Sequence, residues 1–426
     1  MYARLLLVVI AAVSLARGID AENVPSIHGM QYLIVIPDTV EKMSFVQEHE
    51  RLPGFDFLEI KKRVNSPVKV LVTADHAKSF KSALDAYEIE YTVILDDLNA
   101  VRGLLNQDQA LKLSLINRPT SKTYSFDFFP RYNQIVQHLK YLAQKHEHVT
   151  LIEIGKSYEN RSIYGVKISS SATPKPIVLI DAGIHAREWI APTTALYTIT
   201  QLAENKTNSN LYKNVDWFII PSLNPDGYEF SHTDYRMWRK TRSVNNFSSC
   251  YGVDANRNFG LKWMTVGASS NPCSDTYAGP KPFSEPETQA LRDFALSKKG
   301  LVKAYLTLHS YGQYFLHPWG YTSDLPENAP TLRYVAENAA KALKSVSGTH
   351  YVIGSSTNVL YAAAGGSDDW AMGVAGADVS YTIELPGGGI FGFNPPPNRI
   401  LPVGIETFEA IKSIGSYVGT RWGQRY

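Results

Sequence analysis

The stretch that decides the fold runs from Pro176 to Pro192 and reads PIVLIDAGIHAREWIAP. Residues 176–180 form an uninterrupted apolar run, which is typical of a buried strand. The run ends before Gly183, and His185 and Glu188 follow closely. An imidazole and a carboxylate three residues apart can bind one metal ion, and these donors favour Zn²⁺ in catalytic sites. Alone, the pattern is weak, because a surface histidine and glutamate in a loop would be its more common explanation.

The composition of the 426-residue chain is that of an ordinary globular protein, with 44% apolar and 12% aromatic residues. Its length permits two or three domains. The net charge of +2 and the absence of a long basic run argue against nucleic acid as a partner. Residues 1–18 combine a positive start, an apolar core and small residues at the end, which predicts a secretory signal peptide. No second long apolar run follows, so we expect a secreted, extracellular protein that does not span a membrane.

The chain contains two cysteines, Cys250 and Cys273. For an exported protein the simplest expectation is one disulfide between them. Three sequons, at Asn160, Asn205 and Asn246, are candidate glycosylation sites, although such triplets often occur by chance.

A small block at about residues 25–96 alternates short strands and helices, which predicts an open α/β sandwich. No cluster of chemically active residues is evident within it. A helical connection follows, and then a polar stretch around 117–125 reads as a linker. We expect a trypsin-like protease to cut there. Arg118 is a poor site because a proline follows it, so Lys122 and Lys112 are better candidates.

The larger block, from about Tyr124, alternates apolar strands with amphipathic helices. This order predicts a mixed, largely parallel sheet with helices on both faces. The strands are expected at 150–154, 162–168, 176–180, 215–220, 302–308 and 379–385, and the helices at 129–146, 193–204, 284–298, 336–346 and 405–418. Ligands of such sheets bind at the carboxyl ends of strands. His185, Asn224, His309 and Glu384 all lie at or near such ends.

His309 closes an apolar strand and is the natural third ligand of the metal site. A lone histidine there would more often be a buried core residue, but a partial metal site already exists. His317 is the rival, and it lies beyond the strand end.

Glu384 ends another apolar strand, where burial of an ionised carboxylate is costly unless the group has a partner or a function. Beside zinc, which lowers the pKa of water toward ~7, it can act as a general base. The basic run at 236–242 offers a cation for an oxyanion, although a solvated surface would also explain it.

Together these motifs resemble the zinc metallocarboxypeptidases of the pancreatic and insect digestive type. The matching segments, in the order and spacing of that family, are His185-x-x-Glu188, residues 238–242 (WRKTR), 254–258 (DANRN), 309–311 (HSY) and 365–370 (GGSDDW). The resemblance covers nearly the whole chain from about Tyr124. It implies an activation propeptide at 19–122, which caps the active site until removed, and a catalytic domain at 123–426.

The resemblance also implies a role for each matched residue. One Zn²⁺ is held by His185, Glu188 and His309, and Asp254 holds the other nitrogen of His185. Glu384 is the general base and Arg239 stabilises the oxyanion. The substrate-binding residues are Arg187, Asn256, Arg257, Ser310, Tyr311, Tyr361, Asp368 and Phe393, among which Arg257 offers a planar fork for the free α-carboxylate.

Substrate preference depends on residue 368, which the resemblance places at the bottom of the pocket for the terminal side chain. Family members that prefer Lys or Arg have Asp there, as this chain does. We therefore expect a carboxypeptidase B-like enzyme that acts on peptides with a free C-terminus. Protein carboxypeptidase inhibitors are further expected partners. The alternatives are an A-type or broad-specificity enzyme and a catalytically inactive peptide-binding protein. The sequence departs from many relatives at 385–390 (LPGGGI), where they carry an Arg-Asp pair, so fine preference and inhibitor sensitivity stay open.

Overall fold

The computed structural model describes residues 26–61, 63–101 and 124–423. The expected signal peptide and the candidate cleavage sites Lys112 and Lys122 lie outside the described residues. Within these ranges, no helix is both long and apolar enough to cross a membrane.

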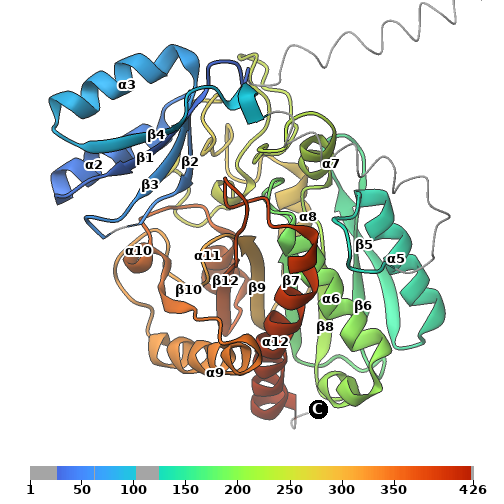
Figure 1. Ribbon diagram of the computed structural model, residues 1–426. Coiled ribbons are helices and arrows are strands. Elements are labelled where there is room, and N and C mark those ends of the chain that lie inside the picture. The colour runs from blue at the N-terminus through green and yellow to red at the C-terminus, as the bar shows by residue number, and fades with distance from the viewer. Residues whose placement is uncertain (1–25, 62, 102–123, 424–426) are drawn as a thin grey trace, which may run out of the picture.

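The N-terminal unit is a four-stranded antiparallel sheet with the strand order β2-β3-β1-β4 (Figure 1). Its elements are β1 (Gln31–Ile36), α2 (Val40–Glu48), β2 (Phe55–Glu59), β3 (Val68–Val72), α3 (Ala74–Ala86) and β4 (Glu90–Leu95). The inward side chains of β1 and β3 form one apolar core with Phe80 and Leu84 of α3. This arrangement is the open α/β sandwich that the sequence predicts.

The C-terminal unit is built on an eight-stranded sheet with the order β11-β10-β12-β9-β7-β8-β6-β5. The central strands β12, β9, β7 and β8 run parallel, and antiparallel pairs flank them on both sides. The strands are β5 (Val149–Lys156), β6 (Ser162–Ile168), β7 (Ile177–Ala182), β8 (Asp216–Ile220), β9 (Val302–Ser310), β10 (Tyr314–His317), β11 (Val352–Ser355) and β12 (Val379–Leu385). The prediction of a mixed, largely parallel sheet is confirmed.

Helices cover both faces of this sheet. One apolar cluster packs against α5 (Tyr132–Lys145), α6 (Ile190–Glu204), α9 (Ala329–Ser347) and α12 (Ile400–Trp422). A second, on the opposite face, packs against α8 (Pro286–Ser297) and α11 (Ser367–Trp370). The strands and helices expected within the described ranges are present, although α9 and α12 begin several residues earlier than expected, and most of the expected helical connection before the linker lies outside the described residues. The structure adds α7 (Pro225–Thr233), α10 (Ser356–Val359), β10 and β11, which are short or lack a clear apolar period.

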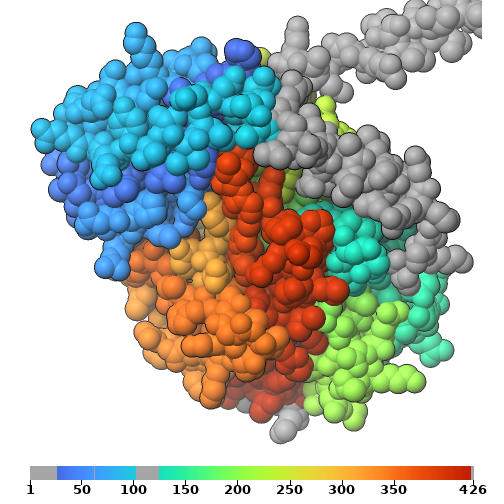
Figure 2. All heavy atoms as spheres, in the orientation of Figure 1, coloured from blue at the N-terminus to red at the C-terminus, as the bar shows by residue number. Residues whose placement is uncertain are grey.

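The N-terminal unit lies against the larger unit, as the blue atoms of Figure 2 show. Met30, Tyr32 and Leu71 share one apolar cluster with Trp238 and Phe391. The N-terminal sheet is therefore packed on the same region of the larger unit that carries the predicted site residues.

Candidate metal centre and substrate cavity

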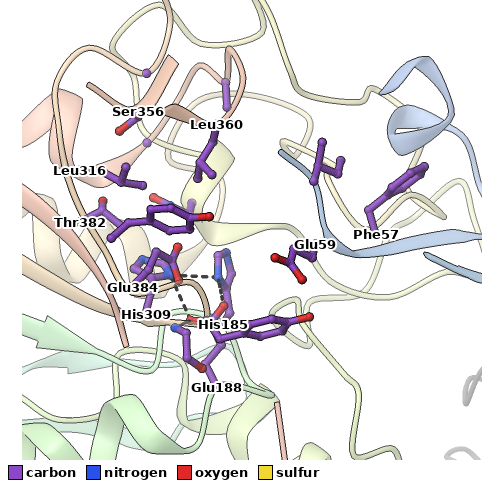
Figure 3. A pocket seen from close by; sticks show the side chains of 18 of the residues that line it. Phe57, Glu59, His185, Glu188, His309, Leu316, Ser356, Leu360, Thr382 and Glu384 are labelled. Carbon is purple, nitrogen blue, oxygen red and sulfur yellow. Dashed lines mark hydrogen bonds and ion pairs between the residues drawn. The ribbon is translucent and has the colours of Figure 1, made fainter. Parts of the chain in front are cut away.

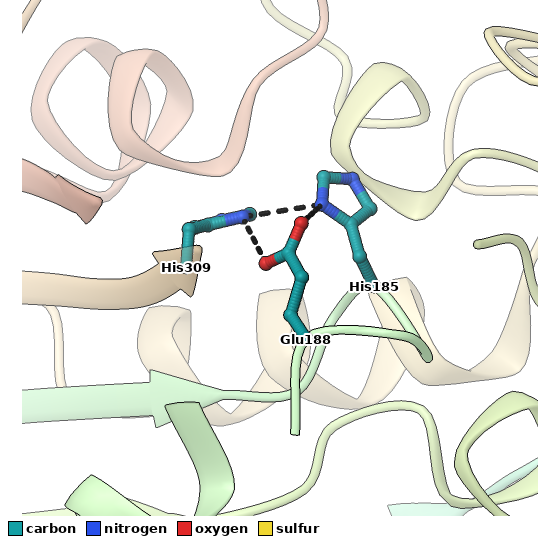
Figure 4. Close-up of side chains that lie close together, drawn as sticks. All are labelled: His185, Glu188 and His309. Atoms are coloured by element: carbon teal, nitrogen blue, oxygen red, sulfur yellow. Dashed lines mark hydrogen bonds and ion pairs between the residues drawn. The ribbon is translucent and has the colours of Figure 1, made fainter. Parts of the chain in front are cut away.

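His185, Glu188 and His309 come together as a compact donor group (Figure 4). One ligand atom from each lies within 4.8 Å of the others. The Nδ1 atom of His185 is 2.7 Å from Glu188 Oε1, and the Nδ1 atom of His309 is 3.1 Å from Glu188 Oε2. Two imidazole nitrogens and one carboxylate are a ligand set that catalytic zinc sites use, with a position left for water or substrate. The residues present therefore fit a zinc ion.

The parallel register of the sheet explains why these residues meet. His185 and Glu188 lie between the end of β7 and the start of α6, and His309 lies near the end of the adjacent strand β9. Carboxyl ends of neighbouring parallel strands share one edge, so distant segments deliver donors to one point. All three side chains are buried, with 1–4% of their surfaces exposed.

The charges of the group are tightly linked. Burial would lower the pKa of His309, but Glu188 raises it to about 9. Burial and the positive charge of Arg239 lower the pKa of His185. Burial would raise the pKa of Glu188, yet the two histidines hold it well below its usual value. Glu188 therefore stabilises the positive charge of His309, and it can equally stabilise a divalent cation, because metal binding displaces such a proton.

Asp254 contacts both the metal-ligand group and Arg239. It is fully buried, and its Oδ1 atom is 3.1 Å from the Nε2 atom of His185. Its Oδ2 atom accepts two hydrogen bonds from Arg239, at 2.9 and 3.1 Å. Burial would raise the pKa of Asp254, but Arg239 and His185 hold it far below its usual value. Asp254 therefore fixes the orientation of the His185 ring and the place of the Arg239 guanidinium.

Glu384 stands beside the metal-ligand group. It lies one residue before the end of β12 and pairs in register with His309 of β9. Burial raises the pKa of Glu384 to about 7. Its Oε2 atom has no hydrogen-bond partner within the described part of the chain. A carboxyl group poised between its two protonation states near neutral pH is suited to accept and return a proton.

These residues line a cavity of about 150 Å³ (Figure 3). Its wall contains the predicted residues Arg187, Glu188, Arg239, Asn256, Arg257, His309, Ser310, Tyr311, Tyr361, Asp368, Glu384 and Phe393, together with His185. The structure thus brings all the predicted metal-binding, catalytic and substrate-binding residues to one place.

Arg257 and Asn256 form one side of this cavity. The Nε and Nη1 atoms of Arg257 donate to the carbonyl oxygens of Gly267 and Asn256, at 2.9 and 3.0 Å. The Asn256 carboxamide oxygen accepts from the backbone N–H of Ser367. These bonds hold the guanidinium in a fixed position on the cavity wall, which favours binding of a carboxylate in one orientation.

Asp368 closes the cavity on the side of α11. Only 5% of its surface is exposed, so it does not point into solvent. Burial raises the pKa of this carboxyl group, against the opposing effect of a hydrogen bond from the backbone. A Cβ atom at Gly366 would come within 2.9 Å of the Asp368 Oδ1 atom, so a glycine there keeps the carboxylate accessible from the cavity. Leu316 and Leu360 supply apolar wall nearby.

Arg187 and Phe393 form another part of the cavity wall. The guanidinium of Arg187 lies 4.4 Å from the centre of the Phe393 ring, and the Tyr311 ring packs edge-on against Phe393 at 4.9 Å. Arg187 also donates to Asp56 Oδ2 at 2.6 Å. Asp56 belongs to β2, so the N-terminal unit occupies a residue expected to bind substrate.

The N-terminal unit supplies further groups to this region, which the sequence does not reveal. Phe57, Leu58, Glu59 and Ile60 line the cavity. Glu50 is 9% exposed, and its carboxyl group interacts with the Tyr361 hydroxyl and the charge of Arg257. The N-terminal unit therefore contributes individual side chains to the site of the larger unit, which the sequence analysis did not expect. Its acidic residues look like ordinary surface charges in sequence, and only their position against the larger unit gives them a role.

The expected disulfide is present between Cys250 and Cys273. It closes the loop that leads from the basic segment at 236–242 toward α8, and it lies close to the N-terminal unit.

Comparisons with known proteins agree with this geometry. Residues 135–410 match the family described as zinc carboxypeptidase, and residues 33–101 match the carboxypeptidase activation peptide. The chain belongs to the zinc carboxypeptidases. Carboxypeptidase B of Astacus astacus is 48% identical over 290 residues, which cover 67% of this chain and 96% of that protein.

Solved structures of the family show the same architecture. The crystal structure of carboxypeptidase A from Helicoverpa armigera is similar with a TM-score of 0.86 and 33% identity, covering 93% of this chain and 98% of that one. Bovine thrombin-activatable fibrinolysis inhibitor, solved in complex with tick carboxypeptidase inhibitor, is similar with a TM-score of 0.66 and 36% identity, covering 69% and 99%. This carboxypeptidase is thus a zinc-dependent peptide hydrolase that carries an activation peptide.

Proposed function

We propose that this zymogen, once its propeptide is removed, releases C-terminal Lys or Arg from peptides. The observation that carries the proposal is the buried carboxylate of Asp368 in the wall that also holds Arg257. A buried carboxylate without a cation is costly, so a positively charged substrate side chain is its natural complement. Asp368 and Arg257 would bind the two ends of one residue, the side-chain cation and the α-carboxylate.

The family relationship establishes the reaction, and the geometry supports a role for each residue in it. His185, Glu188 and His309 would hold the zinc. Zinc supplies Lewis-acid chemistry when bound, polarising a carbonyl group and activating water.

Glu384 would move the proton. With its pKa raised to about 7, its carboxylate can take a proton from the attacking water and pass it to the departing amine. Arg239, held by Asp254, is placed to donate hydrogen bonds to the oxygen that becomes negative at the scissile carbonyl. Because Asp254 fixes the guanidinium beforehand, little reorganisation is needed when that charge develops.

Exopeptidase action follows from the group of residues that would bind the free α-carboxylate. Arg257 and Asn256 would bind the free carboxylate, and Tyr361 would close over it. Arg187, Ser310, Tyr311 and Phe393 would contact residues that precede the scissile bond. A peptide continuing past the bound residue has no α-carboxylate for Arg257, so we expect cleavage to be confined to the last bond.

The test compares trypsin-activated enzyme on matched peptides that end in Arg, Lys, Leu or Phe. We expect kcat/KM to be at least about 100-fold higher for the basic pair, since truncating one partner of a buried charge pair costs about 3 kcal/mol or more. Asp368→Ala should remove that preference and leave zinc content unchanged. Asp324→Ala, which removes an exposed carboxylate, is the matched control. A wild-type preference for Leu or Phe that persists in Asp368→Ala would assign an A-type enzyme instead.

We further propose that the protein is secreted after removal of residues 1–18, and that a trypsin-like protease separates a propeptide at 19–122 from a catalytic domain at 123–426. The support is the lysine at the end of the polar linker and the family match on each side of it. N-terminal sequencing of the secreted and the trypsin-activated protein tests both boundaries. A protein carboxypeptidase inhibitor is a further expected partner, which an inhibition assay on the activated enzyme would reveal.

A further inference from the structure

A second cavity lies between the propeptide and the catalytic domain, beside the disulfide. Its volume is about 270 Å³, and it shares no lining residue with the substrate cavity. The propeptide contributes Met30, Gly54, Phe55, Asp56, Leu71 and Thr73, and Cys250 and Cys273 line the catalytic side. Removing the propeptide would therefore take away six of its fifteen lining residues.

Two carboxyl groups meet in this cavity across the domain boundary. Asp56 is 9% exposed, and its Oδ1 atom has no hydrogen-bond partner in the described ranges, because only Oδ2 is bonded to Arg187. Asp275 of the catalytic domain keeps part of its surface open to solvent. Burial and the neighbouring Asp56 raise the pKa of Asp275 to about 7. A buried, unpaired carboxylate oxygen is unusual in a folded protein and usually indicates a missing partner.

The nearby cations are already committed to other groups. Lys240 donates through Nζ to the carbonyl oxygen of Pro272 at 2.6 Å. Arg187 is bonded to Asp56 Oδ2 and to the carbonyl oxygen of Met237, and its guanidinium lies on the Phe393 ring. Neither side chain is bonded to Asp56 Oδ1, so this oxygen is left for a group that enters the cavity.

Most of the remaining wall is apolar or aromatic, apart from Thr73 and Ser249. Phe55, Tyr235, Met237, Trp238 and Tyr251 all line the cavity. Aromatic faces attract cations, and they also bury the hydrocarbon part of an organic ligand. A carboxylate pair surrounded by aromatic rings is the chemistry that recognises organic ammonium and amidinium ions.

We propose that this cavity binds a small organic cation, with its charged head between Asp56 and Asp275 and its apolar body against Trp238. The site exists only while the propeptide is in place, so the ligand binds the zymogen and holds the two domains together. It is distinct from the substrate cavity and does not depend on the preference for Lys or Arg.

The experiment is calorimetric titration of intact zymogen with 2-phenylethylamine, an aromatic primary amine. We expect a dissociation constant on the order of 1 mM, as suits a ligand of about nine non-hydrogen atoms. The uncharged isostere 2-phenylethanol should bind at least tenfold more weakly. Trypsin-activated enzyme, freed of the cut propeptide, should lose this binding.

Two variants of the zymogen assign the binding to a site. Asp275→Asn should weaken the amine at least tenfold, whereas Asp368→Ala, which alters the substrate cavity, should leave its affinity unchanged. Normal turnover of Asp275→Asn after activation will show that the variant is folded. The proposal is overturned if wild-type zymogen binds no amine, if Asp275→Asn binds it as well as wild type, or if Asp368→Ala abolishes binding. If Asp275→Asn does not fold, the other two comparisons test the proposal. It is overturned if the zymogen binds 2-phenylethanol as tightly as 2-phenylethylamine, or if the activated enzyme binds the amine as tightly as the zymogen does.

Discussion

Replacement of Asp56 by Asn should open the uncut zymogen. In the structure Asp56 Oδ2 accepts a hydrogen bond from the buried Arg187 guanidinium at 2.6 Å, and this ion pair joins the propeptide to the catalytic domain. Breaking a buried ion pair by removing one partner costs about 3–5 kcal/mol. The asparagine keeps an acceptor oxygen, and Arg187 keeps Met237 and the Phe393 ring, so we expect about 2 kcal/mol. At ~1.4 kcal/mol per factor of ten, the open fraction should rise about 30-fold.

The assay is hydrolysis of a small chromogenic peptide by uncut zymogen, with cleavage excluded by gel electrophoresis. We expect kcat/KM of Asp56→Asn zymogen to exceed that of wild type about 30-fold. Trypsin treatment provides an internal control, because residue 56 leaves with the propeptide and the two activated enzymes become the same molecule. Glu41→Gln, which neutralises an exposed carboxylate on α2, should change nothing. A change under threefold for Asp56→Asn, or an equal rise for Glu41→Gln, would refute the reasoning.

Three further predictions concern the catalytic domain. Asp254→Asn should weaken zinc retention about 10–100-fold, measured as zinc content after dialysis against graded chelator, because the buried carboxylate orients a metal ligand. Burial raises the pKa of Glu287 from 4.5 to about 8, so the folded state binds this proton more tightly and stability falls as the pH rises between these values. At pH values above 8, Glu287→Gln should therefore have a higher melting temperature than wild type, and below pH 4.5 the two should be equal. A difference seen only below pH 4.5 would show that Glu287 is not a buried acid. Replacing both Cys250 and Cys273 by Ser should cost about 3 kcal/mol and lower the calorimetric melting temperature by several degrees, whereas an unchanged value would mean the loop is held by other contacts.

The metal-binding residues could be predicted because His185 and His309 lie at or near the ends of strongly apolar strands and Glu188 follows His185 at a spacing that allows both to bind one metal ion. Their meeting point follows from a parallel sheet, in which strand ends share an edge. The roles of His185, His309 and Glu384 could be predicted without knowledge of side-chain packing. Resemblance to the family was needed for Arg257 and Asp368, which lie in irregular segments without a local pattern.

The contacts made by the propeptide could not be predicted. Glu50 and Asp56 are acidic residues in a short helical turn and a strand edge, and sequence alone gives no sign that they face Tyr361 and Arg187. Their role depends on how two separately patterned units pack together. The short strands β10 and β11 were missed for a related reason, since four residues are too few to establish a period.

The mixed apolar cluster between the two units has a practical consequence for handling the enzyme. Met30, Tyr32 and Leu71 cover Trp238 and Phe391 as long as the chain is intact. Removal of the propeptide, as proposed, would expose this aromatic surface to solvent. The uncut zymogen should therefore stay monomeric when it is concentrated and stored. Activated enzyme should self-associate at high protein concentration unless a peptide covers the exposed aromatic surface.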